Sequence, residues 1–148
     1  MALAIDEATR LEIRRVFRAP VGAVYAAWTD AQQVSQWMAP SDDFGATEAT
    51  LDVRVGGRYR IVMRGPDGET HRVGGTYEEV IPNRRLVYTW AWESTPERQS
   101  RVRVEFRAVD EGTELVLVHD RFFDTEARDK HQHGWHGCIG RFERYLSR

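Results

Sequence analysis

The sequence contains a single cysteine, Cys138, among its 148 residues. One cysteine excludes an intramolecular disulfide, and the Cys and His residues nowhere show the spacing of a structural zinc site. The chain also lacks any run of about eighteen apolar residues, and its first residues do not resemble a secretory signal. These absences predict a cytoplasmic protein with no membrane insertion.

The sequence also has no large excess of charge of either sign. The 21 basic and 23 acidic side chains give a formal net charge of -2, and arginines alternate with acids, as in Arg10, Glu12 and Arg14. This pattern is typical of a solvated surface and argues against nucleic acid as a partner. Length and composition predict one domain over residues 1–148, with residues 1–9 as a flexible N-terminal extension.

Hydrophobic periodicity predicts a strand followed by two short helices. Alternation with period two predicts the strand over residues 11–17, and apolar residues at helical spacing over 21–28 predict a helix that begins after Pro20. Asp30, three residues before Gln33, resembles a capping box and predicts a second short helix that Pro40 ends. The segment over residues 38–43 is a candidate gate because it is short and polar.

Six more strands and a long helix are predicted after this point. The strands are separated by turn residues; the first ends near Val55 and the others cover residues 59–63, 73–81, 86–92, 102–109 and 113–122. Brief turns between sequential strands indicate an antiparallel meander. Apolar residues at spacings of three and four predict a helix over 125–146. The expected fold class is α+β, a curved seven-stranded antiparallel sheet wrapped around this C-terminal helix.

The aromatic segment over residues 86–92 predicts the wall of an inner face. Its alternation places Tyr88 and Trp90 on one side of a strand, opposite Trp135 and Ile139 of the long helix. Large aromatic bodies with polar tips form either a core with satisfied hydrogen bonds or the lining of a cavity. The pattern leaves both open.

Short motifs recur over nearly the whole chain at residues 17–20, 28–30, Trp37, 54–57, 85–90, 112–115, His119 and 134–135. In their order and spacing the chain resembles the helix-grip fold of the START and birch-pollen-allergen (SRPBCC) superfamily, and more closely the subfamily named after the C-terminal domain of the activator of the heat-shock-protein-90 ATPase. The resemblance implies a cavity between sheet and helix that holds a small hydrophobic or aromatic molecule, without a cofactor, and it is compatible with a homodimer.

The residues expected to line that cavity come from the inner face of the sheet, the second helix and the long helix. They are Trp37, Tyr59, Met63, Tyr77, Tyr88, Trp90, Val104, Phe106, Leu117, His119, Trp135 and Ile139. Two alternative functions are open: a cofactor-independent cyclase, dehydratase or hydrolase that uses the same cavity, and a protein-interaction or co-chaperone module.

Acid-base chemistry in such an enzyme would depend on His119, Glu79 or Tyr88. His119 continues the inward series of its strand, where an imidazole can donate and accept protons or simply satisfy hydrogen bonds in the core. Either Glu78 or Glu79 faces inward, because a bulge at Gly74 and Gly75 would reset the alternation; if Tyr77 points inward, Glu79 should do so too.

A metal site is not expected. His131, His133 and His136 begin the long helix, but a metal needs three or four converging ligands, and a solvated helix start explains these histidines. Cys138 lies on the apolar stripe of the helix, which predicts an inert packing role.

Overall fold

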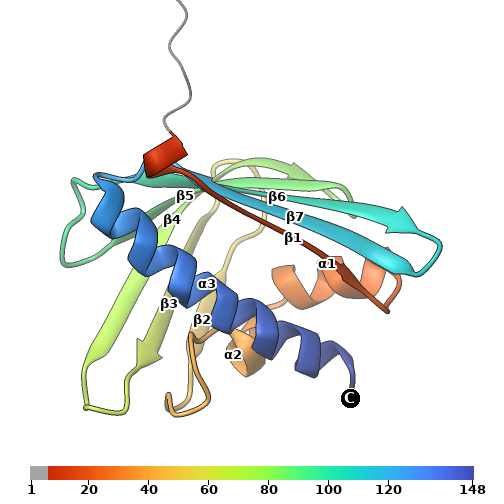
Figure 1. The fold of residues 1–148 in the computed structure, drawn as a ribbon, viewed down its shortest axis with the longest axis horizontal. Helices are drawn as coiled ribbons and strands as arrows, with labels where there is room; N and C mark the ends of the chain where they lie inside the picture. The colour runs from red at the N-terminus through yellow and green to blue at the C-terminus, as the bar shows by residue number, and fades with distance from the viewer. Residues whose placement is uncertain (1–6) are drawn as a thin grey trace, which may run out of the picture.

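The computed structural model describes residues 7–148 as a curved antiparallel sheet with helices on its concave side (Figure 1). The elements are η1 (Glu7–Thr9), β1 (Leu11–Phe17), α1 (Val21–Thr29), α2 (Ala31–Trp37), β2 (Glu48–Leu51), β3 (Arg58–Arg64), β4 (Thr70–Ile81), β5 (Arg85–Trp92), β6 (Ser100–Val109), β7 (Gly112–Asp120) and α3 (Thr125–Leu146). The predicted helix-grip architecture is confirmed. Residues 1–6 of the predicted extension lie outside the described residues, and residues 7–9 form η1.

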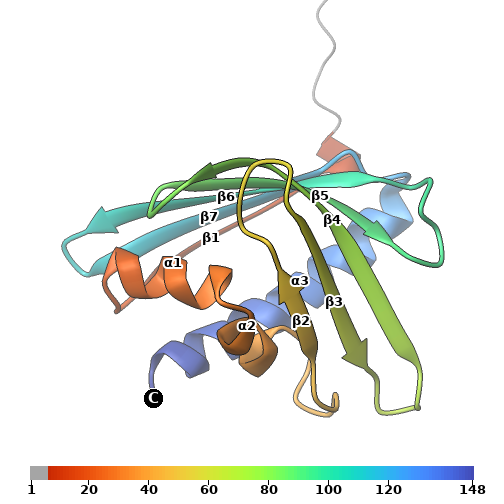
Figure 2. The same ribbon diagram turned by 180° about the vertical axis from the view of Figure 1, so that it is seen from behind.

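The sheet has the order β1-β7-β6-β5-β4-β3-β2, with antiparallel pairing between all neighbours. Short turns join β2 through β7, whereas β1 pairs with β7 from the far end of the chain. Figure 2 shows β2, β3 and β4 bending away from the other strands, so that the sheet curves around α3. Within residues 7–148, no helix has the length and apolarity needed to cross a membrane.

The long helix α3 crosses the concave face of the sheet. Its first turn is capped by Asp124, whose carboxylate accepts a hydrogen bond from the backbone N–H of Ala127 at 2.8 Å. Glu126 in the first turn and Arg144 in the last complement the helix dipole. Its apolar stripe is buried: Trp135, Cys138, Ile139 and Phe142.

Aromatic packing fills one end of the space between sheet and helix. The ring of Phe142 lies 5.2 Å from Trp28 of α1 and 4.6 Å from Trp37 of α2, and the two tryptophans lie 4.8 Å apart. Trp37 donates its indole N–H to the carbonyl of Ala27 at 2.9 Å, which joins the two helices. Under α1 and α2 the interior is therefore a solid core.

Two local predictions are wrong. Asp30 precedes α2, but its side chain makes no capping hydrogen bond. The bulge in β4 lies between Tyr77 and Glu79 and not at Gly74–Gly75. Glycine is needed at position 75 for a different reason: a Cβ there would overlap the carbonyl oxygen of Thr89.

Candidate functional site

A pocket of about 400 Å³ lies at the other end of the interior, between the first half of α3, the strands β3–β5 and the segment after α2. Most of its lining is aromatic or apolar, with a few basic or imidazole side chains. The residues are Met38, Pro40, Phe44, Met63, His71, Trp90, Trp92, Lys130, His131, His133, Gly134, Trp135 and Cys138. The volume lies within the range of small-molecule sites, roughly 300–1,000 Å³.

Local structure explains how the strands reach this pocket. Met63 of β3 pairs directly with His71 of β4, so their side chains lie on the same face of the sheet. Trp90 and Trp92 are two residues apart on β5 and therefore share that face. The sheet thus supplies a mixed thioether, imidazole and indole wall opposite α3.

Three of the twelve predicted ligand residues line this pocket: Met63, Trp90 and Trp135. The other nine lie outside its lining, in the packed core, and each is at most 5% exposed: Trp37, Tyr59, Tyr77, Tyr88, Val104, Phe106, Leu117, His119 and Ile139. The strand pattern identified the inner face but not the part of it that the rings of α1 and α2 cover.

Tyr88 belongs to a tyrosine cluster in the core. Its hydroxyl accepts a hydrogen bond from the indole N–H of Trp28 at 3.3 Å, and its ring lies 5.2 Å from Tyr59 and 5.7 Å from Tyr77. Burial raises the pKa of Tyr88 well above its ordinary value, so the hydroxyl keeps its proton. Tyr88 therefore holds α1 against the sheet.

His119 is completely buried, and both of its ring nitrogens are paired. Trp135 donates its indole N–H to Nδ1 at 3.0 Å, which leaves the proton on Nε2. That proton is donated to the hydroxyl of Ser100 at 2.7 Å, and Ser100 donates in turn to the carbonyl of Trp90. Burial, with a smaller contribution from His131, lowers the pKa of His119 well below 6.5. His119 is a neutral link between β7, β6 and α3.

His131 makes a second network of this kind, at the wall of the pocket. Its Nδ1 lies 2.7 Å from the carbonyl of Ala127, which can only accept, so Nδ1 carries the proton. Its Nε2 accepts from the indole N–H groups of Trp92 at 2.9 Å and Trp90 at 3.3 Å. Burial lowers the pKa of His131. The predicted solvated helix start is wrong for this residue, which ties α3 to β5.

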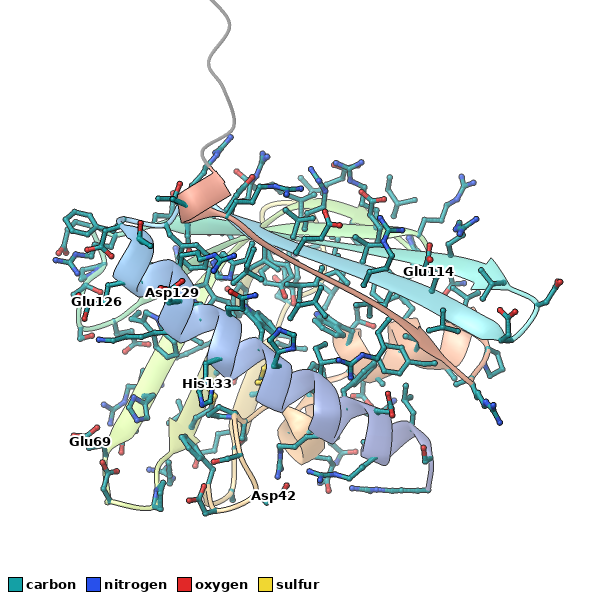
Figure 3. The ribbon with its side chains drawn as sticks, in the orientation of Figure 1. Asp42, Glu69, Glu114, Glu126, Asp129 and His133 are labelled. Carbon is teal, nitrogen blue, oxygen red and sulfur yellow. The ribbon has the colours of Figure 1, made fainter. Side chains whose placement is uncertain are left out.

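His131 was accessible to sequence reasoning through its spacing. It precedes Trp135 by four residues, so the two side chains share one face of the helix. His133 and His136 are exposed, as predicted for a solvated helix start. Figure 3 shows His133 projecting from α3 on the side of β3 and β4.

Glu79 faces away from the pocket because of the bulge. It pairs in register with Val87, whose neighbour Tyr88 points inward, so Glu79 lies on the convex side of the sheet. There its carboxylate is 3.4 Å from the guanidinium of Arg85. Strict alternation would have placed Glu79 on the same face as Tyr77, but the bulge between these two residues moves Glu79 to the opposite face.

The described lining residues favour neither a reactive thiolate nor a metal site. Cys138 lines it, but burial raises the pKa of this thiol to about 12. Among residues 7–148, no three His, Cys, Asp or Glu side chains converge as a metal ion would require. The polar chemistry of the pocket thus comes from its imidazole, indole and ammonium groups.

The segment after α2 forms one wall and is attached to α3. Arg141 donates to the carbonyl of Trp37 at 3.1 Å and to the carboxylate of Asp42 at 2.6 Å. Gly137 packs so closely on Pro40 that a Cβ would overlap the carbonyl oxygen of Pro40. The candidate gate is therefore fastened to the helix that forms the opposite wall.

This fold, with its pocket under the long helix, defines an SRPBCC-type domain. Residues 18–147 match the family model described as Activator of Hsp90 ATPase homolog 1-like protein, and the chain belongs to that family. No curated protein matches the sequence.

Solved bacterial structures have the same fold. A protein from Chromobacterium violaceum is 23% identical, with a TM-score of 0.83 over 95% of this chain and 98% of its own. A protein from Rhodobacter sphaeroides is 27% identical, with a TM-score of 0.82 over 95% and 93%. An AHSA1-like protein from Aeromonas hydrophila is 27% identical, with a TM-score of 0.79 over 93% and 92%. None of these descriptions includes a ligand or a reaction.

Proposed function

We propose that this protein binds a small hydrophobic or aromatic molecule in the pocket between α3 and β3–β5. The observation that carries the proposal is the asymmetry of the interior: aromatic rings fill the end under α1 and α2, whereas about 400 Å³ remains at the other end. Protein cores pack with few voids larger than a water molecule, so a space of this size favours a binding role over ordinary packing.

The chemistry of the lining supports the same conclusion. Trp90, Trp92 and Trp135 supply flat apolar surfaces, and Met63 supplies a flexible thioether that adapts to a ligand. The three acid-base candidates, His119, Glu79 and Tyr88, lie outside the lining, which favours binding over catalysis by those groups.

Two glycines on α3 provide a direct test with a matched control. Gly134 lines the pocket, and the nearest atom to a Cβ at this position is the Cβ of Pro40 at 3.9 Å, so a larger side chain would extend into the cavity. A Cβ on Gly140 meets no atom within 4 Å. Both substitutions replace glycine in a helix interior and should raise helix propensity equally.

The assay measures the fluorescence of N-phenyl-1-naphthylamine, a neutral apolar probe, on titration with each protein. Wild type and Gly140→Leu should bind with the same affinity, whereas Gly134→Leu should bind at least about tenfold more weakly, the equivalent of about 1.4 kcal/mol. Thermal unfolding of both variants checks that they fold. Equal probe binding by the two variants would remove this pocket as the binding site.

A further inference from the structure

The pocket has an excess of hydrogen-bond donors. Its lining, taken over residues 7–148, includes no Asp or Glu side chain, whereas it includes the ammonium of Lys130 and the imidazoles of His71 and His133. An ammonium offers three donors and no acceptor, and an imidazole offers at least one N–H. Polar groups on a ligand would therefore meet donors at the walls of this pocket.

One acceptor within the wall, Nε2 of His131, is already occupied. The neutral His131 ring has one acceptor nitrogen, and the indole N–H groups of both Trp90 and Trp92 converge on it at 3.3 and 2.9 Å. One lone pair serves two donors, so the longer bond from Trp90 is the weaker one. A ligand donor would compete with these indoles, whereas a ligand oxygen would relieve them.

The acids that pair with lining residues are exposed. Glu126 lies 3.1 Å from Lys130 with 76% of its side chain exposed, and Glu69 lies 3.8 Å from His71 with 67% exposed. Figure 3 shows Glu126 near the start of α3 and Glu69 at the end of the β3–β4 hairpin, so neither enters the pocket. An exposed i,i+4 pair contributes little and can exchange its partner.

We propose that the natural ligand is an aromatic or alicyclic carboxylate, with its ring between Trp90, Trp135 and Met63 and its carboxylate at Lys130 and His133. The proposal rests on the proposed function of the pocket and adds the charge of the ligand. A carboxylate supplies only acceptors, which match the donors of the lining, and it can replace Glu126 as the partner of Lys130.

The test uses three probes with one ring system: 2-naphthoate, 2-naphthamide and 2-naphthylmethylammonium. Binding is measured by isothermal titration with the full chain near pH 7 at low salt. 2-Naphthoate should bind at least about fivefold more tightly than the amide, and the ammonium should bind most weakly. Added salt should reduce the preference for the anion, because Lys130 is partly solvated.

Two variants separate a local charge from the net charge. Lys130→Met should weaken 2-naphthoate about two- to fivefold and leave 2-naphthamide unchanged. Arg14→Met removes the same charge from the convex face, where 56% of the side chain is exposed, and should leave both affinities unchanged.

The outcomes distinguish this proposal from the proposed function. If the amide binds as well as the carboxylate and Gly134→Leu weakens the binding of both, the ligand charge is refuted and the pocket remains a binding site. If Lys130→Met and Arg14→Met weaken the binding of 2-naphthoate equally, the preference for the anion comes from long-range attraction and not from contact with Lys130. That result would overturn the assignment. Failure of all three probes to bind would contradict both proposals.

Discussion

Mild acid should destabilise the fold through two buried histidines. His119 and His131 are neutral in the folded protein, since burial lowers both pKa values, and their rings lie 5.3 Å apart. In the unfolded chain each would titrate near the ordinary value of 6.5. Below that pH the unfolded state takes up protons that the folded state does not, so stability is full above 6.5 and is lost as the pH falls.

The magnitude follows from linkage. Between about pH 7.5 and about pH 5.5, a histidine that stays neutral only in the folded state removes about 1.4 kcal/mol from the free energy of unfolding. His119 is completely buried and should contribute this full amount. His131 is partly exposed, so we expect about 0.5–1 kcal/mol from it and a total loss of about 2 kcal/mol.

The two carboxyl groups with lowered pKa values do not interfere in this interval. Hydrogen bonds from Arg60 and Arg107 lower the pKa values of Glu93 and Glu114 below 4.5, so both acids stay ionised above about pH 5.5. Their contribution to stability is lost only in stronger acid.

The assay is urea unfolding at the two pH values for wild type, His119→Gln and the control His136→Gln, which removes an exposed imidazole from α3. His119→Gln should lose about 1.4 kcal/mol less than wild type on acidification, whatever its stability at neutral pH, and His136→Gln should behave as wild type. An identical acid-induced loss in wild type and His119→Gln would refute the assignment of a neutral, buried His119.

Two further substitutions test the packing around the pocket. Gly137→Ala should lower the free energy of unfolding by about 2 kcal/mol or more, because its Cβ would overlap the carbonyl of Pro40, whereas Gly140→Ala should raise it by about 0.5–1 kcal/mol in the same urea assay. Tyr88→Phe should lower the free energy of unfolding by about 1–2 kcal/mol, since it leaves the buried indole N–H of Trp28 without its acceptor. The same variant should bind the probe with unchanged affinity if Tyr88 lies outside the site, and a large loss of probe affinity would place Tyr88 within it.

The fold was predictable because local patterns and global architecture agree. The bounds of α3 match the prediction at both ends, Thr125 and Leu146, since an N-cap and a continuous apolar stripe mark the helix. At most of their ends, the observed strands differ from the predicted ones by a few residues. The exception is β2, which ends at Leu51 and not near Val55, because Gly57 turns the chain back against the backbone of Asp52.

The position of the pocket was not predictable in the same way. Period-two alternation assigns Tyr88 and Trp90 to the same face, but it does not say how far along β5 the rings of α1 and α2 extend. That boundary depends on contacts between residues far apart in sequence, such as the hydrogen bond from Trp28 to Tyr88. The boundary between the packed core and the pocket falls between Tyr88 and Trp90, two neighbouring inward positions of β5.

The bulge in β4 was hidden for a related reason. A bulge inserts one residue into one strand, and its position depends on the partner strand. The Gly74–Gly75 pair was a plausible signal, but a Cβ on Gly74 would overlap the carbonyl oxygen of Tyr59 and a Cβ on Gly75 that of Thr89, so close backbone approach explains both glycines. Glu79 therefore lies on the opposite face from the one that the alternation indicated.

The five tryptophans give this protein an internal set of reporters. Trp28 and Trp37 donate their N–H groups within the packed end, to Tyr88 and Ala27, whereas Trp90, Trp92 and Trp135 donate to two imidazoles beside the pocket. In a ¹⁵N spectrum the five indole signals would form two groups. A molecule that enters the pocket would shift one group and leave the other as an internal reference, so that occupancy can be followed without a label on the ligand.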